Sequence, residues 1–238
     1  MGLNFLISGF LILISFGYLI IPNSPQFYGK SIRRINTKEK IVALTFDDGP
    51  NPPYTEQILD ILKQHNVKAT FFMVGKHIEK CPYMVKKVYQ EGHEIGNHSW
   101  SHKVLICRSS KYIRKEIEQT DKLIYQLGYK GKIYFRAPKG LKFVNLPRIL
   151  NSQNRHHILF DVISWDWCCP GANKIVRCVL KKVKSGSIIL LHDGNGDVNF
   201  IGTDRSQTVI ATDIIIQKLK ARGYGFVTIS ELIQNNAN

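Results

Sequence analysis

Apolar positions along the chain follow two alternating periods. Short runs of apolar and β-branched residues, typical of buried strands, alternate with segments whose apolar residues recur every three or four positions, typical of amphipathic helices. The first strand begins at Ile41 and ends at Asp47 and Asp48, where Gly49 and Pro50 break it. The later predicted strands are 69–74, 93–96, 132–135, 158–164, 187–191 and 226–229. The predicted helices are 54–65, 83–90, 109–127, 145–152, 173–183 and 208–221.

Strands that alternate with helices over this length predict an α/β fold with a parallel sheet or barrel, in one domain from residue 41 to residue 238. The number of strand–helix units, about seven, favours a distorted (β/α) barrel, and an open sheet is the alternative.

The N-terminal segment is apolar. Residues 3–21 carry no charge, and Pro22 follows them. A stretch of this length can cross a bilayer as one helix. We therefore predict a membrane anchor over residues 1–22 and a basic linker over residues 23–40. A cleaved signal peptide is the alternative, although neither a basic n-region nor a small-residue cleavage site is clear.

Composition indicates a strongly basic protein. The 33 Lys and Arg against 18 Asp and Glu give a formal net charge of +15, all of it on residues 30–238. Such a field attracts polyanions. Nucleic acid is disfavoured, because the chain has no Arg-rich recognition helix and no zinc-finger spacing.

The five cysteines are an odd number and do not describe a fully paired disulfide framework. Cys168, Cys169 and Cys178 lack the Cys-x-x-Cys spacing of structural zinc sites. We expect these three residues to be small buried hydrophobes.

Unusual polar residues collect where the predicted strands end. They are Asp47, Asp48, His98, His102, Arg136, Asp161, Asp166, His192 and Asp193. Because α/β barrels place their active sites at the carboxyl ends of the strands, we expect these side chains to lie together. For Asp47 and Asp48 alone, a polar turn that caps the next helix is the alternative.

His98 and His102 are four residues apart and would lie one above the other if their segment were helical. Two histidines and a carboxylate are a common catalytic zinc set that leaves one position open. With Asp48 available from another strand end, we predict a metal site. The alternative is a pair of histidines satisfied by hydrogen bonds.

Five segments, in this order, resemble the motifs of the polysaccharide deacetylase family, the NodB-like domain of carbohydrate esterase family 4. They are 45–50 (TFDDGP), 98–102 (HSWSH), 136–140 (RAPKG), 166–167 (DW) and 190–193 (LLHD). The resemblance spans about residues 40–232. It implies a distorted (β/α) barrel and metal-dependent removal of N-acetyl groups from cell-wall or related glycans.

The resemblance also implies a role for each matching residue. One divalent metal, with zinc favoured and cobalt, nickel or iron also compatible, would be bound by Asp48, His98 and His102. Asp47 would be the general base that activates the attacking water, and Arg136 would pair with it. His192 would be the general acid that protonates the departing amine.

The substrate pocket follows from the same resemblance. Trp167 and Leu190 would wall the space for the acetyl methyl group. A backbone N–H near Pro138 and Lys139 would help to hold the oxyanion.

Two positions depart from the family pattern. Lys139 stands where the family has an aromatic residue, so we expect a cation to face the substrate groove. Ile163 stands where the family has a carboxylate, three residues before the Asp-Trp pair. Because side chains alternate along a strand, Asp161 should project to the same side as Ile163, and we predict that it becomes the partner of His192. The alternative is a strand-edge acid paired with a lysine.

The predicted function is metal-dependent N-deacetylation of an amino-sugar polymer, with peptidoglycan favoured over a chitin-like glycan because peptide carboxylates suit the basic charge. The alternatives are a deformylase or deacetylase of a lipid-linked sugar and a non-catalytic glycan-binding relative. We expect a monomer whose partners are the acetylated glycan and, through the N-terminal helix, the membrane.

The orientation in the membrane is open. Basic residues after the apolar segment favour a cytoplasmic domain. We nevertheless predict an extracytoplasmic domain, because the implied polymer lies outside the cell. Protease accessibility of the domain in intact cells distinguishes the two orientations.

Overall fold

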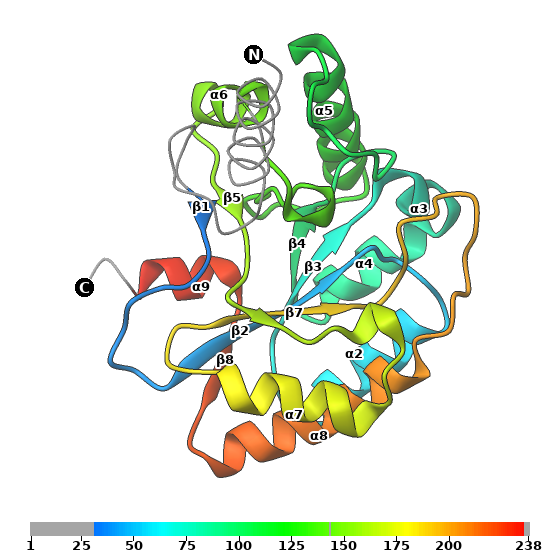
Figure 1. Cartoon of the computed structure of the whole chain (residues 1–238). Coiled ribbons are helices and arrows are strands. Elements are labelled where there is room, and N and C mark those ends of the chain that lie inside the picture. Colours follow the sequence, from blue (N-terminus) through cyan, green and yellow to red (C-terminus); the bar gives the residue numbers. More distant parts are fainter. Residues whose placement is uncertain (1–30, 143, 236–238) are drawn as a thin grey trace, which may run out of the picture.

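Strand β2 runs through the middle of a parallel sheet in the computed structural model, which describes residues 31–142 and 144–235 (Figure 1). On one edge β2 pairs with β7, and on the other its first half pairs with β8 and its second half with β3. Strand β4 then lies beside β3, and β6 beside β7. The bounds are β2 (Ile41–Asp47), β3 (Thr70–Met73), β4 (Glu94–Asn97), β6 (Val162–Ile163), β7 (Ile188–His192) and β8 (Gly225–Val227).

The pairing continues around the molecule. A parallel bridge at Phe135 connects the end of β4 to β5 (His157–Ile158), and β5 pairs with β1 (Ser31–Ile32). An antiparallel bridge between Arg34 and Ser187 then leads back to the start of β7. This parallel-strand α/β architecture is consistent with the distorted barrel that the sequence predicts.

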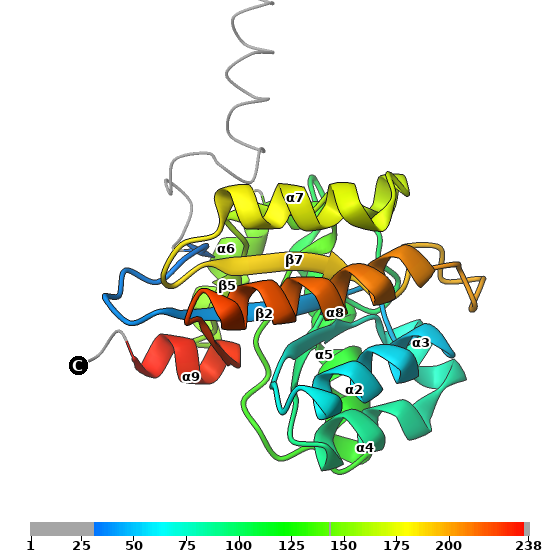
Figure 2. The same ribbon diagram turned by 90° about the horizontal axis from the view of Figure 1, so that it is seen from below.

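Helices cover the outside of this ring. In both ribbon views α7 and α8 lie side by side along β7 and β2, and α2, α3 and α4 follow around the same side (Figures 1 and 2). The bounds are α2 (Tyr54–Gln64), α3 (Gly75–Lys80), α4 (Pro82–Gln90), α5 (Ser110–Gln126), α6 (Asn145–Ser152), α7 (Ala172–Lys182), α8 (Ser206–Ala221) and α9 (Ile229–Gln234).

The alternation along β2 decides which side chains face the helices and which face the barrel interior. Leu44 and Phe46 are fully buried in the core that β2 forms with α2, α4, α7 and α8. Ala43 belongs to a second apolar cluster, on the other side of the sheet. Because side chains alternate along a strand, Asp47 leaves β2 on the side of Ala43. The last residue of β2 therefore places a carboxylate at the interior end of the barrel.

Some elements differ from those predicted from the sequence. The predicted strand that ends at Phe135 forms only the bridge there. The next predicted strand bends at Asp161 and separates into β5 and β6. The last strand ends early because Thr228 caps α9 and forms a capping box with Glu231. Helix α3 was not predicted, since its six residues are too few for a clear periodicity.

Residues 31–35, assigned from the sequence to the linker 23–40, instead belong to the folded domain. Strand β1 lies within this segment. Ile35 is 6% exposed, packs in the second apolar cluster and donates its backbone N–H to the Gly186 carbonyl at 3.0 Å.

The predicted membrane anchor over residues 1–22 lies outside the described residues. Within residues 31–142 and 144–235, no helix combines the length and the apolar character needed to cross a bilayer.

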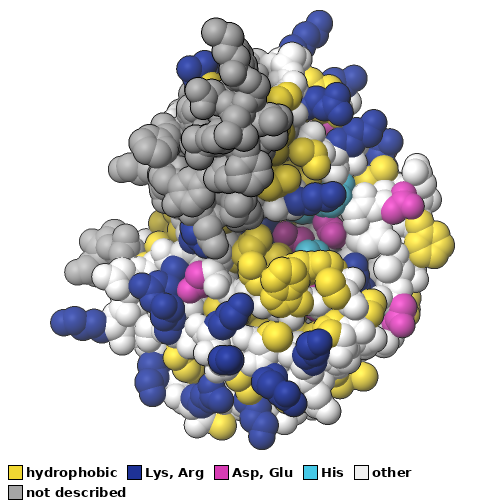
Figure 3. Space-filling model, viewed as in Figure 1, with side chains coloured by type: hydrophobic (Ala, Val, Ile, Leu, Met, Phe, Trp, Pro, Cys, Tyr) yellow, Lys and Arg dark blue, Asp and Glu magenta, His cyan; other side chains and the backbone are white. Residues whose placement is uncertain are grey.

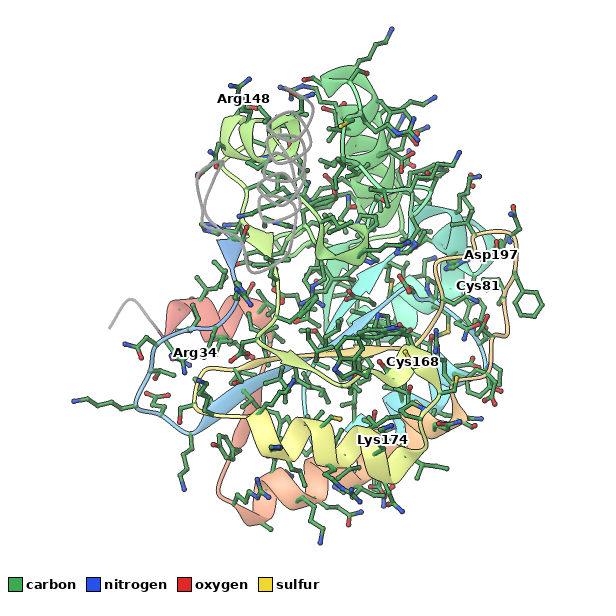
Figure 4. All side chains as sticks on the ribbon, viewed as in Figure 1. Arg34, Cys81, Arg148, Cys168, Lys174 and Asp197 are labelled. Atoms are coloured by element: carbon green, nitrogen blue, oxygen red, sulfur yellow. The ribbon has the colours of Figure 1, made fainter. Side chains whose placement is uncertain are left out.

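The cysteines are all free thiols in the described structure. Cys81 is buried near the start of α4, whereas Cys168, beside the β6–α7 loop, is exposed (Figure 4). Cys169 and Cys107 are exposed and Cys178 is half-buried. The expectation of buried residues was therefore wrong for Cys168 and Cys169, which lie in a loop between β6 and α7.

The place of Ile35 in the fold can be tested by truncation. Ile35→Ala removes buried methyl groups that close the barrel, so we expect it to lower the free energy of unfolding by about 2–4 kcal/mol. The measurement is urea denaturation followed by circular dichroism. Ile210→Ala is the matched control, because Ile210 is 54% exposed on α8; its effect should stay within about 0.5 kcal/mol. Equal effects of the two changes would contradict the assignment of residues 31–35 to the fold.

Candidate active site

A cavity of about 550 Å³ opens where β2, β4 and β7 end. Its walls include Asp47, Asp48, His98, His102 and His192. Figure 3 shows this hollow with acidic and histidine side chains at its floor and a hydrophobic patch at its rim. Polar residues predicted from three separate motifs therefore meet in one cavity. The alternative for the Asp pair is not realised, since α2 begins at Tyr54 after the N-cap residue Pro53 and has no side-chain cap.

Asp47 is held by a fully buried arginine. Arg136 Nη1 donates to Asp47 Oδ1 at 2.6 Å, and the other guanidinium nitrogens donate to the carbonyls of Ile158 and Leu159. The Phe72 ring lies 4.0 Å below the guanidinium carbon. Burial lowers the pKa of Arg136, and Asp47 opposes that effect. A buried cation whose three nitrogens all donate hydrogen bonds fixes the carboxylate in one orientation.

Asp48 faces the two histidines across a short gap. Its Oδ1 lies 3.3 Å from His98 Nε2 and 3.0 Å from His102 Nε2. The Arg136 carbonyl, 2.8 Å from His98 Nδ1, can only accept, so Nδ1 carries the proton and Nε2 presents a lone pair. Asp48 Oδ1 is buried and has no hydrogen-bond donor.

Ligand atoms of these three residues lie within 4.8 Å of one another. Lone pairs that face one another away from water repel unless a cation or a proton lies between them. The set therefore fits a divalent cation bound by one carboxylate and two imidazoles.

The electrostatics of the metal-free set agree with this reading. Burial alone would raise the pKa of Asp48, but His102 and then His98 hold it well below its usual range. Burial alone would lower the pKa of His102, but Asp48 raises it above its usual value. The charge of Asp48 thus favours a positive charge at this position, which a bound cation would supply.

The two histidines do not lie on a helix, which corrects the expected geometry. Ser99 and His102 have positive φ angles of 66° and 53°, so the chain turns back after β4. Ser99 Oγ accepts the backbone N–H of His102, and Glu116 on α5 accepts that of Ser101. The turn brings the ring centroids of His98 and His102 to 5.0 Å.

His192, at the end of β7, is paired with Asp166. Its Nδ1–H donates to Asp166 Oδ1 at 2.8 Å, and its backbone N–H donates to Asp166 Oδ2 at 2.8 Å. Burial alone would lower the pKa of His192, but the Asp166 carboxylate raises it to about 9. The imidazole is therefore protonated at neutral pH.

Asp161 is not the partner of His192, so that prediction was wrong. Asp161 accepts hydrogen bonds from Ser187 Oγ and from the backbone N–H of Ile188, at the opposite end of β7 from His192. The prediction assumed one continuous strand, whereas the chain bends at Asp161. Asp166 is the acidic residue of the Asp-Trp motif at 166–167, so the sequence did contain a signal for the true partner of His192.

The predicted substrate residues divide into two groups. Lys139, Trp167 and Leu190 line the cavity. Pro138 is buried and is not among the lining residues, and its ring carries no N–H, so a backbone donor in this segment can come only from Lys139 or a later residue. Lys139 is exposed and has a left-handed backbone, with φ 59°.

Besides Gly196, sequence reasoning missed three side chains of the wall. They are Phe160, Asn195 and Arg205. Arg205 is 6% exposed, donates its Nε–H to the Gly194 carbonyl and has no carboxylate within 4 Å among the described residues. No local pattern marks these residues, because loops between the motifs bring them to the cavity.

A carboxylate held by arginine, a protonated histidine and a cation-binding set in one cavity define a hydrolase-type centre on an α/β barrel. The family model described as "Polysaccharide deacetylase" matches residues 34–157. The chain belongs to the polysaccharide deacetylase family.

Individual relatives extend the similarity beyond the family model. A peptidoglycan-N-acetylglucosamine deacetylase of Bacillus cereus is 42% identical over 205 residues, which cover 84% of this chain and 91% of that protein. A crystal structure of a peptidoglycan N-acetylglucosamine deacetylase in complex with 4-naphthalen-1-yl-N-oxidanyl-benzamide has a TM-score of 0.79 at 37% identity, over 85% of this chain and 92% of that one. The structure of a CE4 family pseudoenzyme from Bacillus anthracis has a TM-score of 0.77 at 30% identity, over 85% of this chain and 68% of that one.

The pairing of His192 with Asp166 generates a pH prediction. The raised pKa of His192 keeps an acid available up to about pH 9, and activity that needs this proton falls as the pH rises through that value. Asp166→Asn removes the charge that raises the pKa. We expect the alkaline limb of the pH–rate profile to move toward the ordinary histidine range and turnover to fall about 10- to 100-fold.

Asp161→Asn is the control for this prediction, since Asp161 bonds elsewhere; it should leave the alkaline limb in place. An NMR titration of His192 in both variants separates a pKa change from a loss of folding. A limb that moves in Asp161→Asn and not in Asp166→Asn would overturn the assignment.

Proposed function

We propose that this protein is a metal-dependent hydrolase that removes N-acetyl groups from the amino sugars of peptidoglycan. The observation that carries the proposal is the buried, donor-free Asp48 oxygen between two imidazole Nε2 atoms. This set shares its cavity with the Arg136-bound Asp47 and the protonated His192. Amide hydrolysis needs a base for water, an acid for the amine and a stabilised oxyanion, and the cavity offers a group for each.

Asp47 is the proposed general base. One of its oxygens is held by Arg136, and the other lies 3.7 Å from His98 Nε2, beside the metal set. A carboxylate fixed in this way can accept a proton from a water molecule that attacks the acetyl carbonyl.

His192 is the proposed general acid. Its Nδ1 is engaged by Asp166, so Nε2 carries the proton that is free to leave. With a pKa of about 9, the imidazolium delivers this proton to the departing amine at neutral pH.

The metal would be held by Asp48, His98 and His102, and zinc suits two nitrogens and one carboxylate oxygen, with cobalt, nickel or iron as alternatives. When bound, such an ion polarises the acetyl carbonyl and lowers the pKa of water. Trp167 and Leu190 supply an apolar wall for the methyl group. Lys139 contributes the backbone N–H for the oxyanion.

Peptidoglycan is favoured as the polymer because of charge. Lys139 and Arg205 line the cavity, and no carboxylate lies within 4 Å of either among the described residues. Peptidoglycan carries peptide and lactyl carboxylates next to its acetamido groups, whereas chitin-like glycans are neutral. The similarity to a peptidoglycan deacetylase supports the same polymer.

The proposal predicts acetate release from purified peptidoglycan. Incubation with a chelator should stop the release, and added divalent metal should restore it, because the metal set loses its ion. Asp47→Asn should lower turnover at least about 100-fold while it leaves the metal content unchanged, since Asp47 is the base and not a ligand. Acetate is measured by an enzyme-coupled assay and metal by elemental analysis.

Two results would contradict this function. Acetate release that a chelator does not affect would remove the role of the metal. Metal binding and glycan binding without any acetate release would instead identify a non-catalytic relative, as the pseudoenzyme structure is described.

The charge argument predicts a substrate-specific effect of Lys139→Gln. Loss of an exposed ion pair should lower kcat/KM on carboxylate-bearing peptidoglycan fragments about three- to fivefold and leave neutral chitooligosaccharides unaffected. Lys182→Gln, an exposed change of the same charge at the end of α7, is the control and should alter neither. An equal loss of kcat/KM on charged and neutral substrates would show that Lys139 does not bind the substrate carboxylate.

A further inference from the structure

Two tryptophan rings stand exposed at the mouth of the cavity. Trp165 is 47% and Trp167 39% exposed, and their ring centroids lie 4.9 Å apart at 44°. Trp167 also lines the cavity and meets the His192 ring edge-on at 5.2 Å. Aromatic side chains of this size are normally buried, because each gains stability from the area it removes from water. Figure 3 shows a hydrophobic patch directly beside the acidic and histidine side chains of the hollow.

The backbone of the loop between β6 and α7 holds the two rings outward. Ser164 is 0% and Asp166 1% exposed, so buried polar residues alternate with the exposed rings. Ser164 Oγ donates to Asp166 Oδ1, and Thr208 Oγ1 donates to Asp166 Oδ2. These buried bonds fix the residues on both sides of Trp165. The rings are thus presented by a rigid loop, which lowers the entropy lost when a ligand packs on them.

The conformation of Trp165 adds an independent sign of function. Its φ of 62° and ψ of 23° lie in the left-handed region, which residues with a Cβ normally avoid. Neither burial of the ring nor a side-chain cap compensates for this strain. Backbone strain of this kind clusters at active sites and ligand-binding sites, and Trp165 lies beside the cavity.

We infer that Trp165 and Trp167 form a subsite for the sugar ring next to the one that loses its acetyl group. A β-linked hexopyranose presents axial C–H groups on each face of the ring and hydroxyl groups around its edge. The C–H face can pack on an indole ring while the hydroxyl groups stay in water. This inference rests on the proposed function and adds to it the residues on which the neighbouring sugar of the chain packs, Trp165 above all.

Continuity with the cavity favours a sugar over other occupants. Trp167 forms part of the cavity wall and also contacts Trp165, so a glycan whose acetamido group reaches the metal set continues over Trp165. A second copy of this chain is the competing occupant, and it would bury the same rings without any dependence on glycan length.

The experiment compares chitooligosaccharides from the disaccharide to the hexasaccharide with the full chain. For the wild type, kcat/KM for acetate release should rise with length. Trp165→Ala should lower kcat/KM about tenfold on the hexasaccharide, mainly by raising KM, and should change kcat/KM little on the disaccharide. Trp165→Tyr keeps a ring and should restore most of the loss. Tyr125→Ala is the control, because Tyr125 is a 51% exposed aromatic on α5, outside the cavity wall; it should change neither substrate.

Isothermal titration calorimetry with the same sugars separates this subsite from the proposed activity. If acetate is released neither from these sugars nor from peptidoglycan but Trp165→Ala still weakens hexasaccharide binding, the subsite stands and the proposed function fails. An equal loss on short and long sugars would overturn the subsite and point to a disturbed Asp166. A dimer by analytical ultracentrifugation that Trp165→Ala dissociates, with no change in length dependence, would also overturn it.

Discussion

The buried side chain of Arg136 is the interaction on which the site depends. Its guanidinium fixes Asp47, its carbonyl fixes the tautomer of His98, and its backbone N–H donates to Asn97 at the end of β4. One residue therefore orients both the proposed base and a proposed metal ligand. Removing either Arg136 or Asp47 would leave an uncompensated charge buried in the barrel. The contacts of Arg136 therefore stabilise the barrel interior as well as the site.

The general fold was predictable because it follows from periodicity. Apolar runs and helical spacing gave β2, β3, β7 and most helices within a residue or two. The exceptions are elements too short for a period, such as α3 and the bridge at Phe135, and segments where a local cap decides the end, as Thr228 does. Most of the predicted site residues meet in one cavity for the same reason, since parallel strands end on one side of the barrel; Asp161 and Pro138 are the exceptions.

The failures at the site were failures of local geometry. The Asp161 prediction assumed that period two continued through a segment that in fact bends. The spacing of His98 and His102 would bring the two rings together on a helix, but a turn with two positive φ angles does so instead. Arg205 and Phe160 reach the cavity only through tertiary packing, and no pattern in a single sequence identifies such residues.

The proposed mechanism requires a single cation between Asp48, His98 and His102. X-ray absorption of the zinc-loaded protein, with anomalous diffraction to place the ion, tests it most directly. The account predicts one ion per chain, bound by two imidazole nitrogens and a carboxylate oxygen at about 2.0–2.2 Å, and its loss in the His98→Ala/His102→Ala double variant. Full occupancy in that variant, or an ion bound elsewhere in the wild type, would contradict the account.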